Sequence, residues 1–346
     1  MFVIFTDLES DYVIIGEHKM IKMVKISLVS VLCALQLLLY AGCSSSSQIS
    51  SKENSTPKTS DFKKYSLAPE GQKGIGVGFY KNNGKIDSNY VFYQKSGDVF
   101  ERNLGIDHRM SDNMTYKLLL FVDFKQEKFY VGNDLTKDFE FQLNPNEHKM
   151  IPIKLFPLEK GLHDVFFVIV VAPNIKSLNK DFRRSTISTN LIFKRFNIIV
   201  ENEKIPEINF TKPFKTESPT KLQGVFYNKD PNHLKLWFTE EVKPGTNLSY
   251  YTHIGNKNSS FSNKYAIISL FDWKQVDLDD KGTKVLFSEC KNSSKIVLQN
   301  NLKIPDIGGI FDFCSILVYN PYEKLNISNR EVETLNRVGI NIKSNK

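Results

Sequence analysis

Residues 116–126 read YKLLLFVDFKQ, and residues 265–275 read YAIISLFDWKQ. Tyr, Asp, Lys and Gln recur at the same places in both stretches, 149 positions apart. A second matched pair follows in the same order: residues 157–173 read PLEKGLHDVFFVIVVAP, and residues 305–321 read PDIGGIFDFCSILVYNP. Two matched blocks at nearly the same spacing indicate an internal duplication, which predicts two homologous domains.

Short β-strands are predicted along the first repeat. Residues 137–143 alternate between apolar and polar side chains, whereas residues 165–172 are apolar on both faces, which is typical of a central strand. The chain has 26 Phe and 14 Tyr but only three Ala after residue 43, and this composition favours strands over helices. The predicted strands span residues 74–80, 89–94, 116–124, 137–143, 149–155, 163–173 and 188–200.

The turn before the apolar stretch of residues 165–172 resembles a feature of a known fold. Residues 158–164 read LEKGLHD, which resembles the corner before the penultimate strand of immunoglobulin-like domains. Together with the number of short strands, this resemblance implies an all-β fold of two tandem immunoglobulin-like antiparallel β-sandwich domains. We expect the first domain over residues 71–203 and the second over residues 204–346, with the boundary near residues 201–213.

The N-terminal region predicts export. Residues 26–41 form an apolar run of 16, preceded by Lys22 and Lys25. The run is short for a membrane-spanning helix, which needs about 20 apolar residues, and a basic segment before a short apolar run is typical of a signal peptide. Residues 1–19 are acidic instead, so Met20 or Met23 is an alternative start of translation.

The end of this run is Leu39-Tyr40-Ala41-Gly42-Cys43. It resembles the lipobox of bacterial lipoproteins, although that family usually has leucine at the place of Tyr40. The resemblance implies a signal peptide over residues 1–42, a lipid on the Cys43 thiol, and a protein anchored on the extracytoplasmic face of the cell membrane. Cleavage nearby by an ordinary signal peptidase is the alternative.

Residues 43–70 are expected to form a tether. Eight of the 17 residues from 44 to 60 are serine and none is aromatic. Such a segment buries too little apolar surface to offset its ordering entropy, so disorder is predicted.

The recurring carboxylates are the first candidates for catalysis. Asp123 and Asp164 of the first repeat match Asp272 and Asp312 of the second. Each is expected where a strand meets a turn, and aspartate there usually bonds local backbone amides. Recurrence in both copies favours a structural role, so we predict no catalytic residue.

Metal and cofactor sites are not predicted either. The histidines at 108, 148, 163, 233 and 253 are scattered, no nucleophile elbow is present, and no helix signal follows the glycines of residues 74–78. Residues 277–282 read DLDDKG, but Lys281 and Ser288 stand where a calcium loop needs acceptor oxygens. A hairpin turn is the better interpretation.

Two cysteines lie in the second repeat. Cys290 and Cys314 are 24 residues apart, and an exported protein can pair them in a disulfide. Cys314 aligns with Phe166 of the first repeat, which instead favours a buried free thiol. The sequence leaves both outcomes open.

These observations predict a membrane-anchored bacterial lipoprotein that acts as a non-catalytic binding or scaffolding module of the cell envelope. The net charge of +8 favours an anionic cell-wall polymer as partner. A glycan or another envelope protein is a further candidate, and aromatic pairs such as Trp237-Phe238 and Tyr250-Tyr251 suit a sugar. Nucleic acid is not expected, because the lysines are spread out. The alternatives are an exported hydrolase with an unrecognised site and an accessory subunit of an export or transport complex.

Overall fold

Strands dominate the computed structural model, which describes residues 12–13, 73–185, 191–257, 263–328, 331–335 and 337–343. The predicted signal peptide, apart from Tyr12–Val13, lies outside these residues, as do Cys43 and the whole predicted tether over residues 43–70. Among the described residues, no helix has the length and apolar character needed to cross a membrane.

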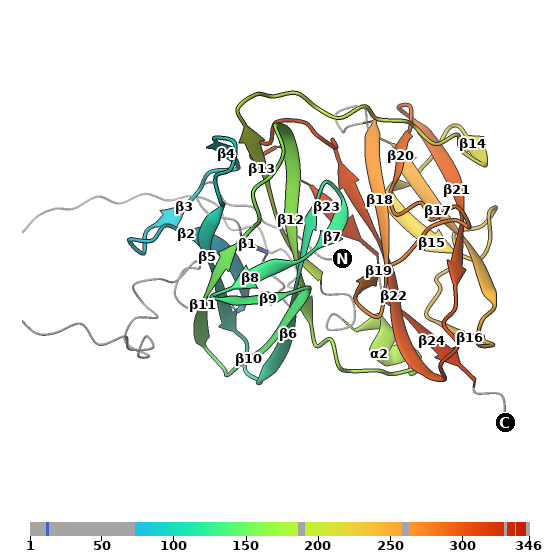
Figure 1. Ribbon diagram of the computed structural model, residues 1–346. Coiled ribbons are helices and arrows are strands. Elements are labelled where there is room, and N and C mark those ends of the chain that lie inside the picture. The colour runs from blue at the N-terminus through green and yellow to red at the C-terminus, as the bar shows by residue number, and fades with distance from the viewer. Residues whose placement is uncertain are drawn as a thin grey trace, which may run out of the picture.

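The first sandwich consists of two facing sheets (Figure 1). One sheet has the order β1-β2-β5-β11-β8-β9, with β3 added to β2. Its strands are β1 (Tyr12–Val13), β2 (Gly74–Tyr80), β3 (Ile86–Asp87), β5 (Glu101–Arg109), β8 (Phe129–Val131), β9 (Asp134–Thr136) and β11 (Glu147–Lys154). The other has the order β10-β6-β12-β13-β4, with β7 added to β6. Its strands are β4 (Val91–Gln94), β6 (Met114–Val122), β7 (Lys125–Glu127), β10 (Asp138–Leu143), β12 (Gly161–Val171) and β13 (Leu191–Val200).

The second sandwich repeats this plan. One sheet has the order β14-β21-β17-β15, made of β14 (Lys215–Glu217), β15 (Gln223–Asn228), β17 (Asn247–Asn256) and β21 (Ser294–Lys303). The other has the order β16-β24-β22-β18-β19, with β20 added to β18 and β23 to β22. Its strands are β16 (Thr239–Val242), β18 (Lys264–Phe271), β19 (Lys274–Gln275), β20 (Leu286–Glu289), β22 (Gly309–Tyr319), β23 (Val332–Thr334) and β24 (Val338–Ile342).

The two sandwiches share an uncommon detail of pairing. Strands are antiparallel throughout, except that β4 pairs parallel with β13 and β16 pairs parallel with β24. These two parallel pairs have equivalent registers. Val91 of β4 lies opposite Asn197 of β13, and Thr239 of β16 lies opposite Gly339 of β24. The predicted all-β fold of two tandem immunoglobulin-like sandwiches is confirmed.

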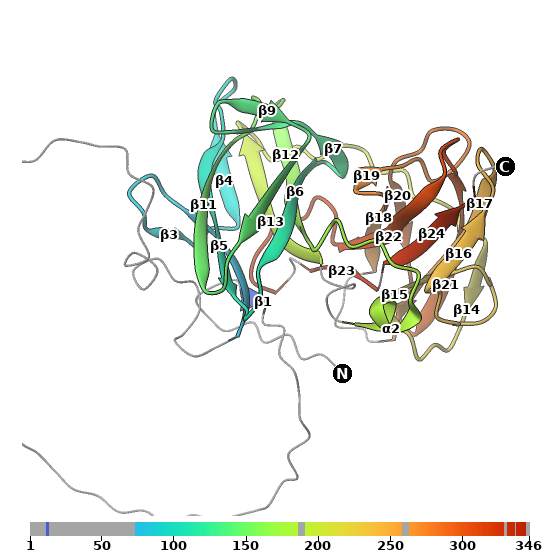
Figure 2. The same cartoon turned by 90° about the horizontal axis from the view of Figure 1, so that it is seen from below.

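The sandwiches pack against each other through the sheets that contain β12 and β22 (Figure 2). Alternate residues of β12, including Phe167 and Ile169, face the core of the first sandwich. The residues between them, including Phe166 and Val168, belong to one apolar cluster with Ile316 of β22. Residues 165–172 are therefore apolar on both faces because one face fills the first core and the other fills the contact between the sandwiches.

The predicted strands of the first repeat match observed strands to within a few residues, but one central strand was missed. β5 reads ERNLGIDHR and lies between β2 and β11. Two of its polar side chains, Asp107 and His108, are buried, and His108 has partners: its Nδ1 lies 2.6 Å from the Tyr116 hydroxyl, and its Nε2 lies 2.6 Å from the Asp112 carbonyl. A strand that buries polar side chains shows no clear alternation of polarity.

Candidate functional site

Two tight turns bring the recurring aspartates to the contact between the sandwiches. Asp123 and Phe124 join β6 to β7, and Asp272 and Trp273 join β18 to β19. All four residues have positive φ, from 49° to 67°. Hairpin turns of this kind favour Asn, Asp and Gly, whereas the left-handed conformation costs Phe124 and Trp273 roughly 1–2 kcal/mol each. Burial of both rings offsets that cost, since Phe124 is 0% exposed and Trp273 3%.

Each aromatic ring is buried against the other sandwich. The Phe124 ring centroid lies 5.2 Å from that of Tyr322 and 5.6 Å from that of Phe287. The Trp273 indole Nε1 donates a hydrogen bond of 3.0 Å to the carbonyl of Pro173. The two turns thus fasten the sandwiches reciprocally.

The glutamines that recur in the repeat also bond to each other. The backbone N–H of Gln126 donates to Gln275 Oε1 at 2.8 Å, and the backbone N–H of Gln275 donates to Gln126 Oε1 at 2.8 Å. Their amide nitrogens donate to the carbonyls of Trp273 and Phe124, at 3.2 and 2.7 Å. This exchange is that of an isologous, two-fold contact formed within one chain.

A buried ion pair reinforces the same contact from the first sandwich. Arg195 Nε donates to Asp164 Oδ1 at 2.8 Å, and its Nη2 donates to Asp164 Oδ2. The same guanidinium donates to the carbonyls of Tyr319 and Asn320 in the second sandwich. Asp164 Oδ2 also accepts the backbone N–H of Tyr322 at 3.2 Å. One pair therefore binds both domains.

The second sandwich contributes the reciprocal contacts. Arg337 Nη1 donates to the carbonyl of Val171 at 3.1 Å, as Arg195 does in the opposite direction. Buried Asp312 accepts Arg183 Nη1, which comes from the short helix α2 (Lys180–Arg184) in the connection between β12 and β13 of the first sandwich. We call this set of turns, glutamines and ion pairs the junction.

In the structure each of the four recurring aspartates bonds to other groups of the protein. Asp123 Oδ1 accepts the backbone N–H of Asp164 at 3.0 Å, and its Oδ2 lies 2.7 Å from His163 Nδ1. Burial lowers the pKa of His163, but the bond to Asp123 and the Glu159 carbonyl raise it, and the net shift is upward. The Asp123–His163 pair is a local contact at the edge of the junction.

A pocket of about 300 Å³ lies beside the junction. Its walls come from the 228–239 segment at the start of the second sandwich and from Lys180 of α2. Leu236, Trp237 and Phe238 supply apolar lining, and Leu236 is 53% exposed. The Arg184 guanidinium lies 5.0 Å from the Phe238 ring centroid, so both sandwiches build the pocket.

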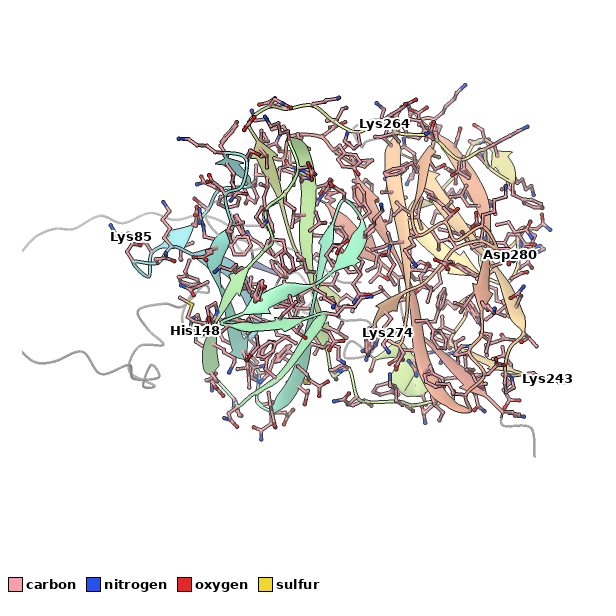
Figure 3. The ribbon with its side chains drawn as sticks, in the orientation of Figure 1. Lys85, His148, Lys243, Lys264, Lys274 and Asp280 are labelled. Atoms are coloured by element: carbon pink, nitrogen blue, oxygen red, sulfur yellow. The ribbon has the colours of Figure 1, made fainter. Side chains whose placement is uncertain are left out.

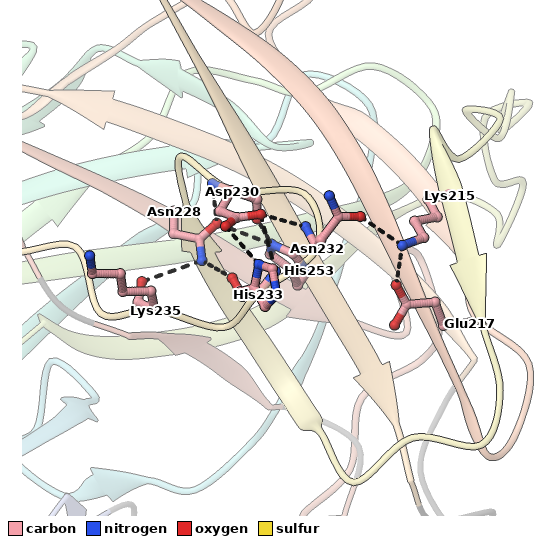
Figure 4. A network of polar contacts seen from close by, with 8 residues as sticks. All are labelled: Lys215, Glu217, Asn228, Asp230, Asn232, His233, Lys235 and His253. Carbon is pink, nitrogen blue, oxygen red and sulfur yellow. Dashed lines mark hydrogen bonds and ion pairs between the residues drawn. The ribbon is translucent and has the colours of Figure 1, made fainter.

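A polar network holds the pocket segment in shape (Figure 4). Asn228 Nδ2 donates to the carbonyls of His233 and Lys235, at 2.6 and 3.3 Å. Buried His253 Nε2 lies 3.1 Å from Asn228 Oδ1 and 3.0 Å from the Asp230 carbonyl. Burial, helped by the Lys295 ammonium, lowers the pKa of His253 to about 4, so the imidazole is neutral at pH 7 and donates from Nε2.

Residues 277–282, the calcium-loop candidate of the sequence, contain Asp280, which is labelled in Figure 3. Asp279 accepts the backbone N–H of Lys281 and Thr283, and Asp277 pairs with Lys284 at 2.7 Å. Residues 277–282 thus form a turn in which the Asp277 and Asp279 carboxylates have protein partners. Across the described ranges, no group of three or more His, Cys, Asp or Glu side chains is arranged to hold a metal ion.

The two cysteines of the second sandwich are free in the structure, and no bridge joins them. Cys290 belongs to the apolar cluster between the two sheets of that sandwich, whereas Cys314 belongs to the cluster at the contact with the first sandwich. Burial raises the pKa of Cys314 to about 12, so this thiol is protonated at neutral pH. The side chain packs as an apolar group, in line with its match to Phe166.

Sequence reasoning did not identify the pocket, although it singled out Trp237 and Phe238. Trp237 is 6% exposed and lies against Tyr250 and Phe313, so it faces the core, while Phe238 is half-buried. The signal available was the sequence LKLW at residues 234–237, where two leucines and a tryptophan interrupt an otherwise polar connection.

Comparisons with known proteins give no family for the chain. No family model matches it, and no curated protein sequence matches it. Among solved structures, the CARDB domain of the PF1109 protein from Pyrococcus furiosus is 13% identical, with 40% of this chain and 96% of that chain covered and a TM-score of 0.24. A PapD-like domain of human CEP192 is 11% identical, with coverages of 40% and 95% and a TM-score of 0.22. Red sea bream transglutaminase is 8% identical, with coverages of 78% and 31% and a TM-score of 0.22.

Proposed function

We propose that this chain is a non-catalytic binding module of the bacterial cell envelope, anchored by a lipid on Cys43 and facing outward. The observation that carries the binding role is the pocket beside the junction. Ligand sites occur preferentially at contacts between domains, and a preorganised segment reduces the entropy lost on binding. The non-catalytic role is supported by the recurring aspartates, because Asp164 and Asp312 are buried against arginines.

A cell-envelope location follows from the sequence signals at the N-terminus. The apolar run ends in Ala41-Gly42-Cys43 and leads into a serine-rich segment, as in bacterial lipoproteins. A tethered module is held near the membrane at high effective concentration, so even a weak ligand or polymer contact becomes productive. The net charge of +8 adds attraction for anionic partners.

The Cys43→Ser variant tests the anchor. In bacterial cells grown with a labelled fatty acid, the natural chain is expected to carry label and to sediment with membranes. The variant should carry none, since serine has no thiol for the lipid, and should keep its signal peptide. Cys33→Ser, altered inside the apolar run, is the matched control and should be labelled normally. Unchanged labelling of Cys43→Ser would refute the anchor.

A further inference from the structure

The pocket combines two chemical features that point to one class of ligand. Its apolar lining is Leu236, Trp237 and Phe238, and its polar lining includes Lys180, Lys229 and Lys235. Leu234, next in the same segment, is 44% exposed. These leucines leave apolar surface beside the lysines that the fold itself does not bury, and an apolar ligand group would gain by covering it.

The charges at the pocket are unbalanced. Lys229 Nζ pairs with Glu240 at 2.6 Å, and the Asp230 carboxylate accepts the backbone N–H of Asn232 and of His233. Lys180 and Lys235 make no ion pair with any residue that the structure describes. Two ammonium groups, one from each sandwich, are therefore available to a bound anion.

The corresponding connection of the first sandwich shows that the fold does not need these side chains. Residues 81–90 join β2 to β4 as residues 229–238 join β15 to β16. The carbonyls of Tyr90 and Phe238 accept equivalent backbone bonds, from Asn197 at 2.7 Å and Gly339 at 2.8 Å. Yet residues 81–90 read KNNGKIDSNY, without leucine or tryptophan, whereas residues 229–238 read KDPNHLKLWF. The second connection thus presents two exposed leucines, Leu234 and Leu236, where the first presents one exposed isoleucine, Ile86.

We infer that the pocket binds a small organic anion with an apolar body, such as an aryl or alkyl phosphate or carboxylate. The apolar body lies on Leu236 and the edge of Phe238, and Lys180 and Lys235 bind the anionic group. This inference deepens the proposed binding function and rests on it. It requires both sandwiches in their observed arrangement, because Lys180 and Arg184 belong to the first and Leu236 to the second.

Phenyl phosphate is the probe, with inorganic phosphate and phenol as its two separate halves. Each probe is titrated into the full chain in phosphatidylcholine nanodiscs, and its binding is measured by calorimetry and by ligand-observed NMR. Phenyl phosphate is expected to bind with a stoichiometry of one and at least about tenfold more tightly than either half, because only it engages the lysines and the apolar lining together.

Paired variants locate the site. The double variant Lys180→Ala with Lys235→Ala, and the single variant Leu236→Ser, should each weaken phenyl phosphate binding about tenfold; all three side chains are exposed and leave the fold intact. The matched control is Lys85→Ala with Ile86→Ser in residues 81–90, which should bind as the natural chain does. Equal binding of phenyl phosphate and phosphate, or equal loss in the control, would overturn the assignment. Cys43 labelling is unaffected by either result, so the anchor stands or falls separately.

Discussion

Replacing Asp164 with alanine is expected to lower the free energy of unfolding by about 3–5 kcal/mol. The carboxylate is 0% exposed and accepts two bonds from Arg195, which is itself 3% exposed. The variant leaves a buried guanidinium without its counter-charge and removes the acceptor of the Tyr322 N–H in the other sandwich. Urea unfolding followed by circular dichroism measures the loss.

Asp134→Ala is the matched control for that variant. Asp134 is an exposed aspartate on the short strand β9, and a substitution there should change the free energy of unfolding by less than about 0.5 kcal/mol. A similar loss in both variants would show that Asp164 has no special place in the junction.

Trp273→Ala is expected to cost about 3–5 kcal/mol of unfolding free energy. The indole is 3% exposed at the contact between the sandwiches, donates to the Pro173 carbonyl, and lies under Arg337 and Lys176 at 5.1 and 5.5 Å. Alanine leaves a cavity there and an acceptor without its donor. Thermal unfolding checks the prediction.

Phe156→Ala removes an aromatic ring that is 43% exposed and distant in sequence from the junction turns. The loss of unfolding free energy in Phe156→Ala should be well under half of the loss in Trp273→Ala. If Trp273→Ala lowered the free energy of unfolding as little as Phe156→Ala, the turn would not stabilise the contact between the sandwiches. Its left-handed backbone would then need another explanation.

The fold could be predicted from sequence because its signals are local. Alternation over residues 137–143, the apolar stretch of 165–172 and the matched blocks all reflect strand periodicity and duplication. β5 could not be predicted, since Asp107 and His108 are buried among tertiary partners that its own sequence does not reveal.

The meaning of the repeated residues also needed the structure. Asp123, Phe124 and Gln126 were recognisable as recurring, but a repeat does not say whether its residues face solvent, the core or the other copy. In the structure Phe124 and Gln126 face the other copy, as the Gln126–Gln275 exchange shows, whereas Asp123 bonds to His163 and to the Asp164 N–H of its own sandwich. The pocket was less predictable still, because it combines α2 with a connection about 50 residues later in the chain.

The central claim is that the junction makes the two sandwiches one cooperative unit. Differential scanning calorimetry of the natural chain tests it most directly. We predict one unfolding transition whose calorimetric enthalpy equals its van't Hoff enthalpy, because neither sandwich can unfold without exposing the shared apolar cluster and the buried Arg195–Asp164 pair. Two separate transitions, with a calorimetric enthalpy about twice the van't Hoff value, would contradict the account.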